Sequence, residues 1–248
     1  MSDQTISVLV VGYADAELLD IACVTSTLAM AAEFGAEPGY DVRLLTPGGH
    51  PVTARPGLRL EAHGALERHT GPVDTLVVSG GHGYRRAARD EVLVAHVRRL
   101  SRDARRVASV CTGATVLAAA GLLDGRRATT HWAYAEGLAH DHPAVTVDPD
   151  PIFVRDGPVA TSASVTSALD LTLSLVEEDH GPEVARRVAR ALVTYMQRPG
   201  TQAQMSLHVG APAPAHDVVR EVDDRRRHGG RAHPAAVASP WLRSPSSS

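Results

Sequence analysis

The chain has 248 residues, a formal net charge of −3 at pH 7 and 44% hydrophobic residues. This composition excludes a wholly disordered chain, and the near-neutral charge argues against a broad electrostatic grip on nucleic acid. Two cysteines are too few for a disulfide scaffold, which leaves a reactive thiol as the alternative. The sequence shows no signal peptide and no apolar run of membrane-spanning length, so we expect a cytoplasmic protein without a membrane partner.

The first half of the chain alternates strand and helix patterns. A continuous apolar run predicts a buried strand at Ile6–Val11, and the following pattern predicts a helix over 17–34 that Gly35 ends. Similar signals predict strands at Tyr40–Thr46, 73–79 and Arg106–Val110, and helices at 90–102 and 113–121.

The second half continues this alternation. Strands are predicted at 128–130, 145–148 and 152–154, and helices at 164–178 and 182–196, divided by Gly181-Pro182. Alternating strands and helices with short links predict a mostly parallel sheet that helices cover on both faces.

The composition changes after about residue 200. Prolines recur, a cluster of three arginines lies at 225–227, and no apolar period survives. We therefore predict a folded domain at 1–204 and a mostly disordered tail at 205–248. The arginine cluster is more typical of a solvated tail than of a nucleic-acid contact.

Sites in doubly wound sheets gather at the carboxyl ends of the strands, and the strongest chemical signal here follows the strand Arg106–Val110. Cys111 comes directly after that strand and directly before a helix of small residues, which is the pattern of a nucleophile elbow. A helix N-terminus stabilises a thiolate, so we expect the pKa of Cys111 to lie below the free-thiol value of about 8.5. The alternative is a buried core cysteine.

Two other strand ends carry supporting residues. The glycines of the segment 80–83 free backbone N–H groups to face an oxyanion or a carboxylate. Asp20 lies among apolar neighbours and should be paired or protonated, so near the thiol it could exchange a proton. Its alternative role is that of a carboxylate at a helix start.

Histidines give weaker signals. His131 follows Cys111 by twenty positions and is either a base or hydrogen-bond partner of the thiol, or a packed polar residue. The pair His140 and His142 lacks supporting ligands, so we predict no metal site, and nothing indicates a cofactor.

Together these residues resemble the PfpI-type branch of the class I glutamine amidotransferase-like superfamily. The resemblance rests on LVVGYADAELLDIA (9–22), VVSGGHG (77–83), SVCTGATVLAAAGLLDGRRATTHW (109–132) and VATSASVTSALDLTLSLVEEDHG (159–181). It implies a flavodoxin-like three-layer α/β sandwich that is usually dimeric. By position, Cys111 matches the family's elbow cysteine, Asp20 its buried acid, and His131 a histidine near that cysteine. Gly81 and Thr112 match the residues whose backbone N–H groups face the sulfur.

Two subfamilies look similar. One is the N-terminal domain of GlxA-like AraC-family transcriptional regulators, in which the ending at 179–204 leads into the DNA-binding half. There the domain is thought to sense a small molecule or to mediate dimerisation. The other is isonitrile hydratase, which adds water to an isonitrile to give an N-substituted formamide. That resemblance implies attack by Cys111, proton handling by Asp20 and orientation by the Thr112 hydroxyl.

The sequence departs from the regulator pattern after Gln204, where no helix-turn-helix periodicity follows. We therefore expect a ligand-sensing or structural module of regulator origin, a homodimer that lacks the DNA-binding half and does not bind DNA directly. The alternative is a cysteine-dependent enzyme of the isonitrile hydratase type. A third reading makes Cys111 an oxidation sensor that forms sulfinic acid.

Overall fold

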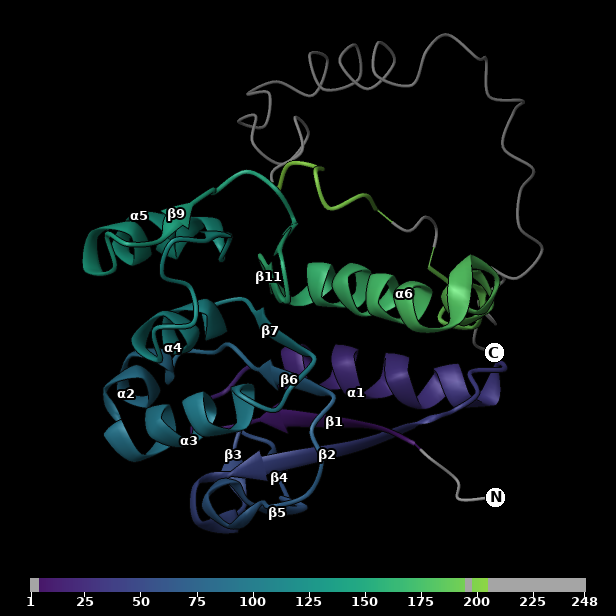
Figure 1. Ribbon diagram of the computed structural model, residues 1–248, viewed down its shortest axis with the longest axis horizontal. Helices are drawn as coiled ribbons and strands as arrows, with labels where there is room; N and C mark the ends of the chain where they lie inside the picture. The colour runs from purple at the N-terminus through teal and green to yellow at the C-terminus, as the bar shows by residue number, and fades with distance from the viewer. Residues whose placement is uncertain (1–4, 195–197, 205–248) are drawn as a thin grey trace, which may run out of the picture. The chain divides into compact units, whose positions relative to one another are not determined.

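The computed structural model describes residues 5–194 and 198–204, so the expected tail at 205–248 lies outside the described residues. Its centre is a seven-stranded sheet (Figure 1). The strands follow the order β10 (Phe153–Asp156), β11 (Val159–Ser162), β7 (Arg106–Val110), β6 (Thr75–Val78), β1 (Ile6–Val11), β2 (Tyr40–Thr46) and β5 (Gly64–Ala65). Only β10 runs antiparallel to its neighbour.

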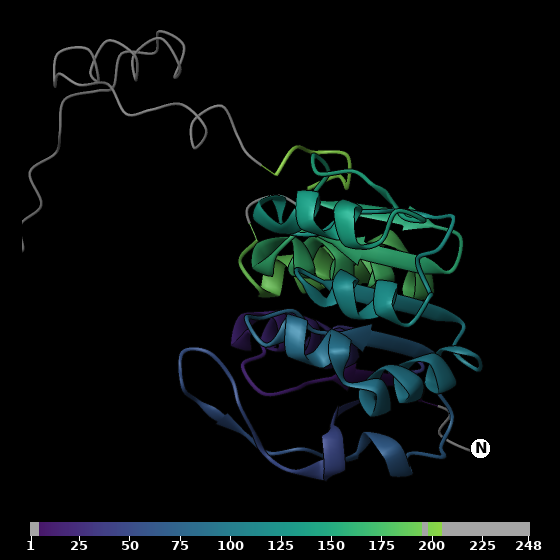
Figure 2. The same ribbon diagram turned by 90° about the vertical axis from the view of Figure 1, so that its left-hand side faces the viewer.

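Helices cover both faces of this sheet (Figures 1 and 2). One layer holds α1 (Leu18–Glu33) packed against α6 (Val165–Ala191). The other holds α2 (Tyr84–Arg89), α3 (Glu91–Ser101) and α4 (Gly113–Ala119), which contact one another. The expected three-layer α/β sandwich with a mostly parallel sheet is confirmed. Because both faces are covered, the strands β6 and β7 are buried along their whole length, as their apolar sequences require.

Small elements complete the described fold. They are the antiparallel pair β3 (Val52–Thr53) and β4 (Arg59–Leu60), the parallel pair β8 (Arg127–Ala128) and β9 (Thr146–Val147), the helix α5 (Trp132–Asp141), and the 3₁₀ turns η1 (Pro47–Gly49) and η2 (Leu66–Arg68).

One sequence expectation is confirmed and others needed correction. The break expected at Gly181-Pro182 is confirmed: within α6 the backbone of Gly181 is not helical, with a φ of 82° and a ψ of 168°, and Pro182 follows it directly. The helical part ends at Ala191, earlier than residue 196. The strand expected at 128–130 ends at Ala128, because Thr129 and Thr130 turn away to bond other parts of the chain.

A buried ion-pair cluster ties α6 to the amino-terminal edge of the sheet. Arg106 is 6% exposed, donates from Nε to Thr75 Oγ1 at 2.7 Å and binds the Asp179 carboxylate through both terminal nitrogens. Arg105 and the Tyr40 hydroxyl donate to the same carboxylate at 2.7 and 2.9 Å. Burial alone would raise the pKa of Asp179, but the hydrogen bonds and charge of Arg106 outweigh it and leave that pKa below its usual range.

We expect Arg106→Ala to lower the free energy of unfolding near neutral pH by about 3 kcal/mol, at the low end of the range for breaking a buried ion pair. The low end applies because Arg105 and the Tyr40 hydroxyl still bind the Asp179 carboxylate. Urea denaturation measures this loss. The contribution of Asp179 is complete above about pH 4, the ordinary aspartate range, and is lost as pH falls through its lowered folded pKa. The two proteins should therefore converge in stability at acid pH.

The matched control is Arg43→Ala, which removes the solvent-exposed pair of Arg43 with Asp41. Exposed pairs contribute at most about 1 kcal/mol. Equal losses in the two variants would contradict the structural role given to Arg106.

Candidate functional site

Cys111 lies at a sharp bend between β7 and α4, as the elbow pattern predicted. Its φ of 52° is left-handed, a conformation that non-glycine residues rarely adopt. Two hydrogen bonds hold this backbone: the Cys111 N–H donates to Ser162 O at 2.9 Å, and the Thr130 hydroxyl donates to Cys111 O at 2.8 Å. The bend turns the side chain away from the strand line, and the residue is 9% exposed. The thiol is therefore presented at the carboxyl edge of the sheet but is largely shielded from water.

Asp20 lies beside this bend, in the first turn of α1, and is 1% exposed. Its Oδ2 accepts a hydrogen bond from the Gly80 N–H at 3.1 Å, whereas its Oδ1 has no partner among the described residues. A Cβ atom at Gly80 would lie 2.6 Å from Asp20 Oδ2 and 2.6 Å from Cys111 Cβ. The carboxyl and the cysteine thus meet over Gly80, and only glycine leaves room for both.

Thr112 and Gly81 form a closed hydrogen-bonded pair next to the thiol. The Gly81 N–H donates to Thr112 Oγ1 at 2.9 Å, and that hydroxyl lies 3.0 Å from Gly81 O, to which it can donate. The N–H of Gly81 is therefore directed at the Thr112 hydroxyl instead of being free for an oxyanion. The Thr112 backbone N–H and hydroxyl do interact with the sulfur and lower its pKa.

The expected low pKa of Cys111 is wrong. Burial, reinforced by the charge of Asp20, raises the pKa of the thiol to about 12 despite the opposing bonds from Thr112. The magnitudes explain this outcome. A helix end contributes about 0.3–1 kcal/mol, less than one pKa unit, whereas burial shifts a pKa by up to about 3–5 units. The thiol is therefore protonated at neutral pH.

Asp20 is the group of this site that gains or loses a proton near neutral pH. Burial first, and the nearby charge of Glu17, raise its pKa to about 7, although the hydrogen bond from Gly80 acts in the opposite direction. The direction of this shift is the one expected for a buried acid, which holds its proton to a higher pH than an exposed aspartate. Because the two groups are electrostatically coupled, the second negative charge is the costly one. A proton retained on Asp20 makes a thiolate at Cys111 easier to form.

Sequence reasoning missed Tyr13, which also faces this site. Its hydroxyl donates to Ser79 O at 2.8 Å. Burial, followed by the charges of Asp20 and Cys111, raises the pKa of Tyr13 well above its usual value, while a hydrogen bond with the Thr112 side chain lowers it. The signal that could have found Tyr13 is its position directly after the β1 strand and its glycine, at the same sheet edge as Cys111.

His131 occupies a different place from the one expected. Its Nδ1 accepts a hydrogen bond from the Ala133 N–H at 3.2 Å, which caps α5, and its ring stacks on Trp132. Burial lowers its pKa. Within the described part of the chain no hydrogen bond joins His131 to Cys111. The neighbouring Thr130, which sequence reasoning did not select, makes the contact with the elbow backbone.

Two further observations concern residues 5–194 and 198–204. They contain no group of three or more histidine, cysteine, aspartate or glutamate side chains placed to bind a metal ion. No helix among them has both the length and the apolar character needed to cross a bilayer.

We expect Asp20→Asn to lower the pKa of Cys111 to a value between about 8.5, that of a free thiol, and about 12, because it removes the charge but not the burial. The pH dependence of iodoacetamide labelling in a Cys23→Ser background measures this, since then only one thiol reacts. Glu17→Gln is the control with the smaller expected shift, because Glu17 acts more weakly on Cys111. An unchanged midpoint in Asp20→Asn would contradict the coupling.

Comparisons with known proteins agree with this fold. The HTH-type transcriptional regulator CdhR of Pseudomonas aeruginosa is 38% identical over 175 residues, which are 69% of this chain and 50% of the regulator. Isonitrile hydratase of Pseudomonas putida is 38% identical over 154 residues, or 61% of this chain and 64% of the hydratase. The expected resemblance to both classes of protein is confirmed. The chain spans about half the length of that regulator.

A solved structure supports the same relationship. The crystal structure of a THiJ/PfpI family protein from Pseudomonas syringae superposes with a TM-score of 0.69 at 25% identity, covering 89% of this chain and 85% of that one. Residues 7–178 match the sequence profile of the DJ-1/PfpI family. Since this match covers more than half of the sequence, the chain belongs to the DJ-1/PfpI family.

Proposed function

We propose that residues 1–204 form a small-molecule-sensing module, and the match to half of a transcriptional regulator supports this proposal. The observation that carries this proposal is a chain of hydrogen bonds from the Cys111 elbow to Gln204, where the described chain leaves the domain. A change at the elbow can therefore reach the segment 198–204.

The links of this chain are short and specific. Thr130 donates its hydroxyl to Cys111 O at 2.8 Å, and its own carbonyl accepts from Gln204 Nε2 at 2.9 Å. Gln204 Oε1 accepts from the Trp132 N–H at 2.9 Å. One glutamine side chain thus binds both sides of the turn that rests on the elbow.

The segment before Gln204 is also fixed to the domain. Arg198 pairs with the buried carboxylate of Asp170 at 2.6 Å, and the Gln204 N–H donates to Asp150 O at 2.7 Å. These attachments make 198–204 part of the folded unit and not a loose linker. Because Arg198 and Gln204 hold this segment at both ends, a shift of the turn at 130–132, which Gln204 binds, can change the conformation of 198–204.

The protonation state of the thiol favours sensing over turnover. The thiolate is the nucleophilic form of cysteine, and burial keeps the pKa of Cys111 at about 12. The same fact disfavours an oxidation sensor, because oxidation also proceeds through the thiolate. A homodimer is part of the proposal, on the family resemblance alone, and the cytoplasmic location stays a prediction.

To test the link, Cys111 is alkylated with iodoacetamide at alkaline pH in a Cys23→Ser background, so that the adduct stands in for an occupant. We expect amide hydrogen exchange to change by about tenfold at 129–132 and at 198–204, which corresponds to one altered hydrogen bond. In Gln204→Ala the change at 198–204 should disappear. Gln202→Ala is the control, because the side chain of Gln202 makes no hydrogen bond with the described residues.

The amides of β1 serve as an internal reference, because a general unfolding would expose them as well. The link would be refuted if the adduct left amide hydrogen exchange at 198–204 unchanged in the parent protein. It would also be refuted if Gln204→Ala showed the same change in exchange at 198–204 as the parent protein.

A second candidate function is hydration of an isonitrile. It is favoured by the Asp20 carboxyl, whose pKa of about 7 allows it to donate and accept a proton at neutral pH. Its Oδ1 is buried and has no partner among the residues that the structure describes. In this reaction the Cys111 sulfur adds to the isonitrile carbon, which gains a proton to give a thioimidate. Water then adds to that carbon and the thiol leaves, so that an N-substituted formamide is released.

Cyclohexyl isocyanide is the substrate that separates the two functions. The sensing proposal predicts no formation of N-cyclohexylformamide above the rate of the Cys111→Ala variant, measured by chromatography. Rapid hydration that Cys111→Ala and Asp20→Ala both abolish would establish the enzyme and refute the sensor.

A further inference from the structure

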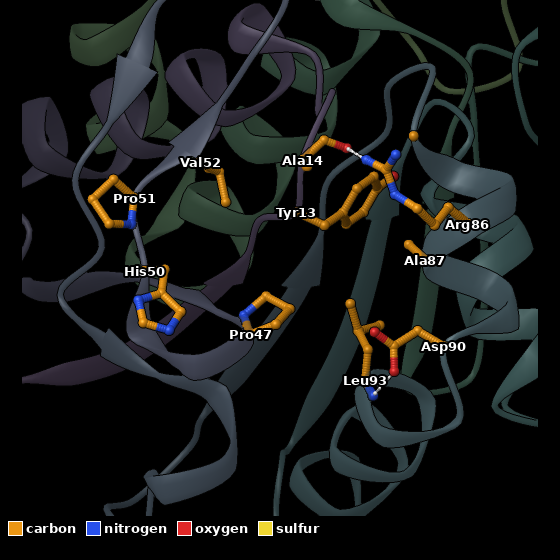
Figure 3. A pocket seen from close by; sticks show the side chains of 11 residues that line it. Tyr13, Ala14, Pro47, His50, Pro51, Val52, Arg86, Ala87, Asp90 and Leu93 are labelled. Atoms are coloured by element: carbon orange, nitrogen blue, oxygen red, sulfur yellow. Dashed lines mark hydrogen bonds between the residues drawn. The ribbon is translucent and has the colours of Figure 1, made fainter.

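A cleft lined by Tyr13 lies between the η1–β3 loop and the helices α2 and α3 (Figure 3). Its volume is about 300 Å³, within the range of small-molecule sites. It opens at the carboxyl ends of β1 and β6, whose connections leave the sheet in opposite directions. Such a topological switch point is where doubly wound folds bind their ligands.

The cleft has an apolar floor and charged ends. Tyr13, Val52 and Leu93 supply buried apolar surface, and Pro47 and Pro51 line the opposite wall. Figure 3 shows Arg86 and Asp90 at opposite ends of the α2–α3 wall, with Ala87 between them. A cation and an anion are therefore separated by an apolar stretch.

Both charged groups keep bonding capacity that the described residues do not use. Arg86 donates only from Nη2, to Ala14 O at 3.2 Å and Asp15 Oδ2 at 3.3 Å, which leaves Nε and Nη1 without partners there. Asp90 caps α3 through Oδ1, which accepts from the Val92 and Leu93 N–H groups, and its Oδ2 has no partner within the described chain. Arg86 can thus bind a carboxylate, and Asp90 can accept from an ammonium group.

We propose that this cleft binds a short ω-amino carboxylate, with its carboxylate at Arg86, its ammonium group at Asp90 and its aliphatic chain on the floor formed by Tyr13 and Leu93. The inference rests on the proposed sensing function, because it gives the sensed molecule a place and a chemical class. Tyr13 connects the two sites: it lines the cleft, and its hydroxyl binds Ser79 O beside the Cys111 elbow.

The binding test uses the full chain and three probes in isothermal titration: 5-aminopentanoate, pentanoate and pentylamine. We expect 5-aminopentanoate to bind at least about tenfold more tightly than either single-charge probe, because each of those leaves one charged group unpaired. Equal affinities, or no saturable binding of 5-aminopentanoate, would overturn the proposal.

Variants assign the two ends. Arg86→Gln should reduce 5-aminopentanoate affinity by about tenfold or more without affecting pentylamine. Asp90→Asn should reduce the affinity for 5-aminopentanoate by a similar factor without affecting the affinity for pentanoate. Asparagine is also a good N-cap residue, so α3 should keep its cap. Arg89→Gln is the matched control, since Arg89 lies on the same helix but does not line the cleft. Unchanged binding in Arg86→Gln or Asp90→Asn would refute the assigned ends.

The connection to Cys111 is tested with the same probe. Saturating 5-aminopentanoate should change the iodoacetamide labelling rate of Cys111 in the parent protein but not in Tyr13→Phe. Binding without any effect on labelling would show that the cleft is not the sensed site. The hydrogen-exchange test of the link between Cys111 and Gln204 uses no cleft ligand. Failure of the cleft proposal and failure of the proposed sensing function can therefore be told apart.

Discussion

The candidate site depends on the placement of one carboxyl group and one thiol in the same water-poor space. Asp20 and Cys111 meet over Gly80, where a single Cβ atom would touch both. Burial raises the pKa of each, so the second negative charge is strongly disfavoured. The resting pair is therefore a thiol beside a carboxyl that titrates near neutrality. Whatever enters the site meets a proton donor and acceptor, and not a preformed thiolate.

The rest of the fold holds that pair in place. The carboxyl is brought by the helix after β1, the glycine by the loop after β6, and the sulfur by the bend after β7. These three strands are neighbours in one parallel sheet, so their carboxyl ends converge. At the opposite edge, the ion pair between Arg106 and Asp179 fixes α6 against β7. The ion pair that stabilises the fold thus lies at the start of β7, and the buried Asp20 and Cys111, whose ionisation is unfavourable, lie at its end.

The sequence predicted the central strands of the sheet, because these depend on local apolar patterns, but it missed β5 and β11 and placed strands at 128–130 and 145–148 that lie near the separate pair β8 and β9. Asp20 and Cys111 were selected through the family resemblance and not through a local pattern alone. The strands Ile6–Val11, Tyr40–Thr46 and Arg106–Val110 have the bounds that their apolar runs predict. The helix α5 was not predicted, since only Ala135 and Leu138 of its residues are buried and no apolar stripe results. The sign of the thiol's pKa shift depends on burial by distant segments, which local pattern does not contain.

Tyr13 and Thr130 were missed for a related reason. Neither belongs to a motif, and each matters only because the fold places it against another segment: Tyr13 against Ser79, and Thr130 against Cys111. Tyr13 also lines the cleft, and Thr130 also binds Gln204, so one residue near the elbow leads to the cleft and the other leads to the segment 198–204. A domain used only for catalysis needs neither connection. A domain that reports occupancy needs both an entry for the signal and an exit, and the elbow lies between them.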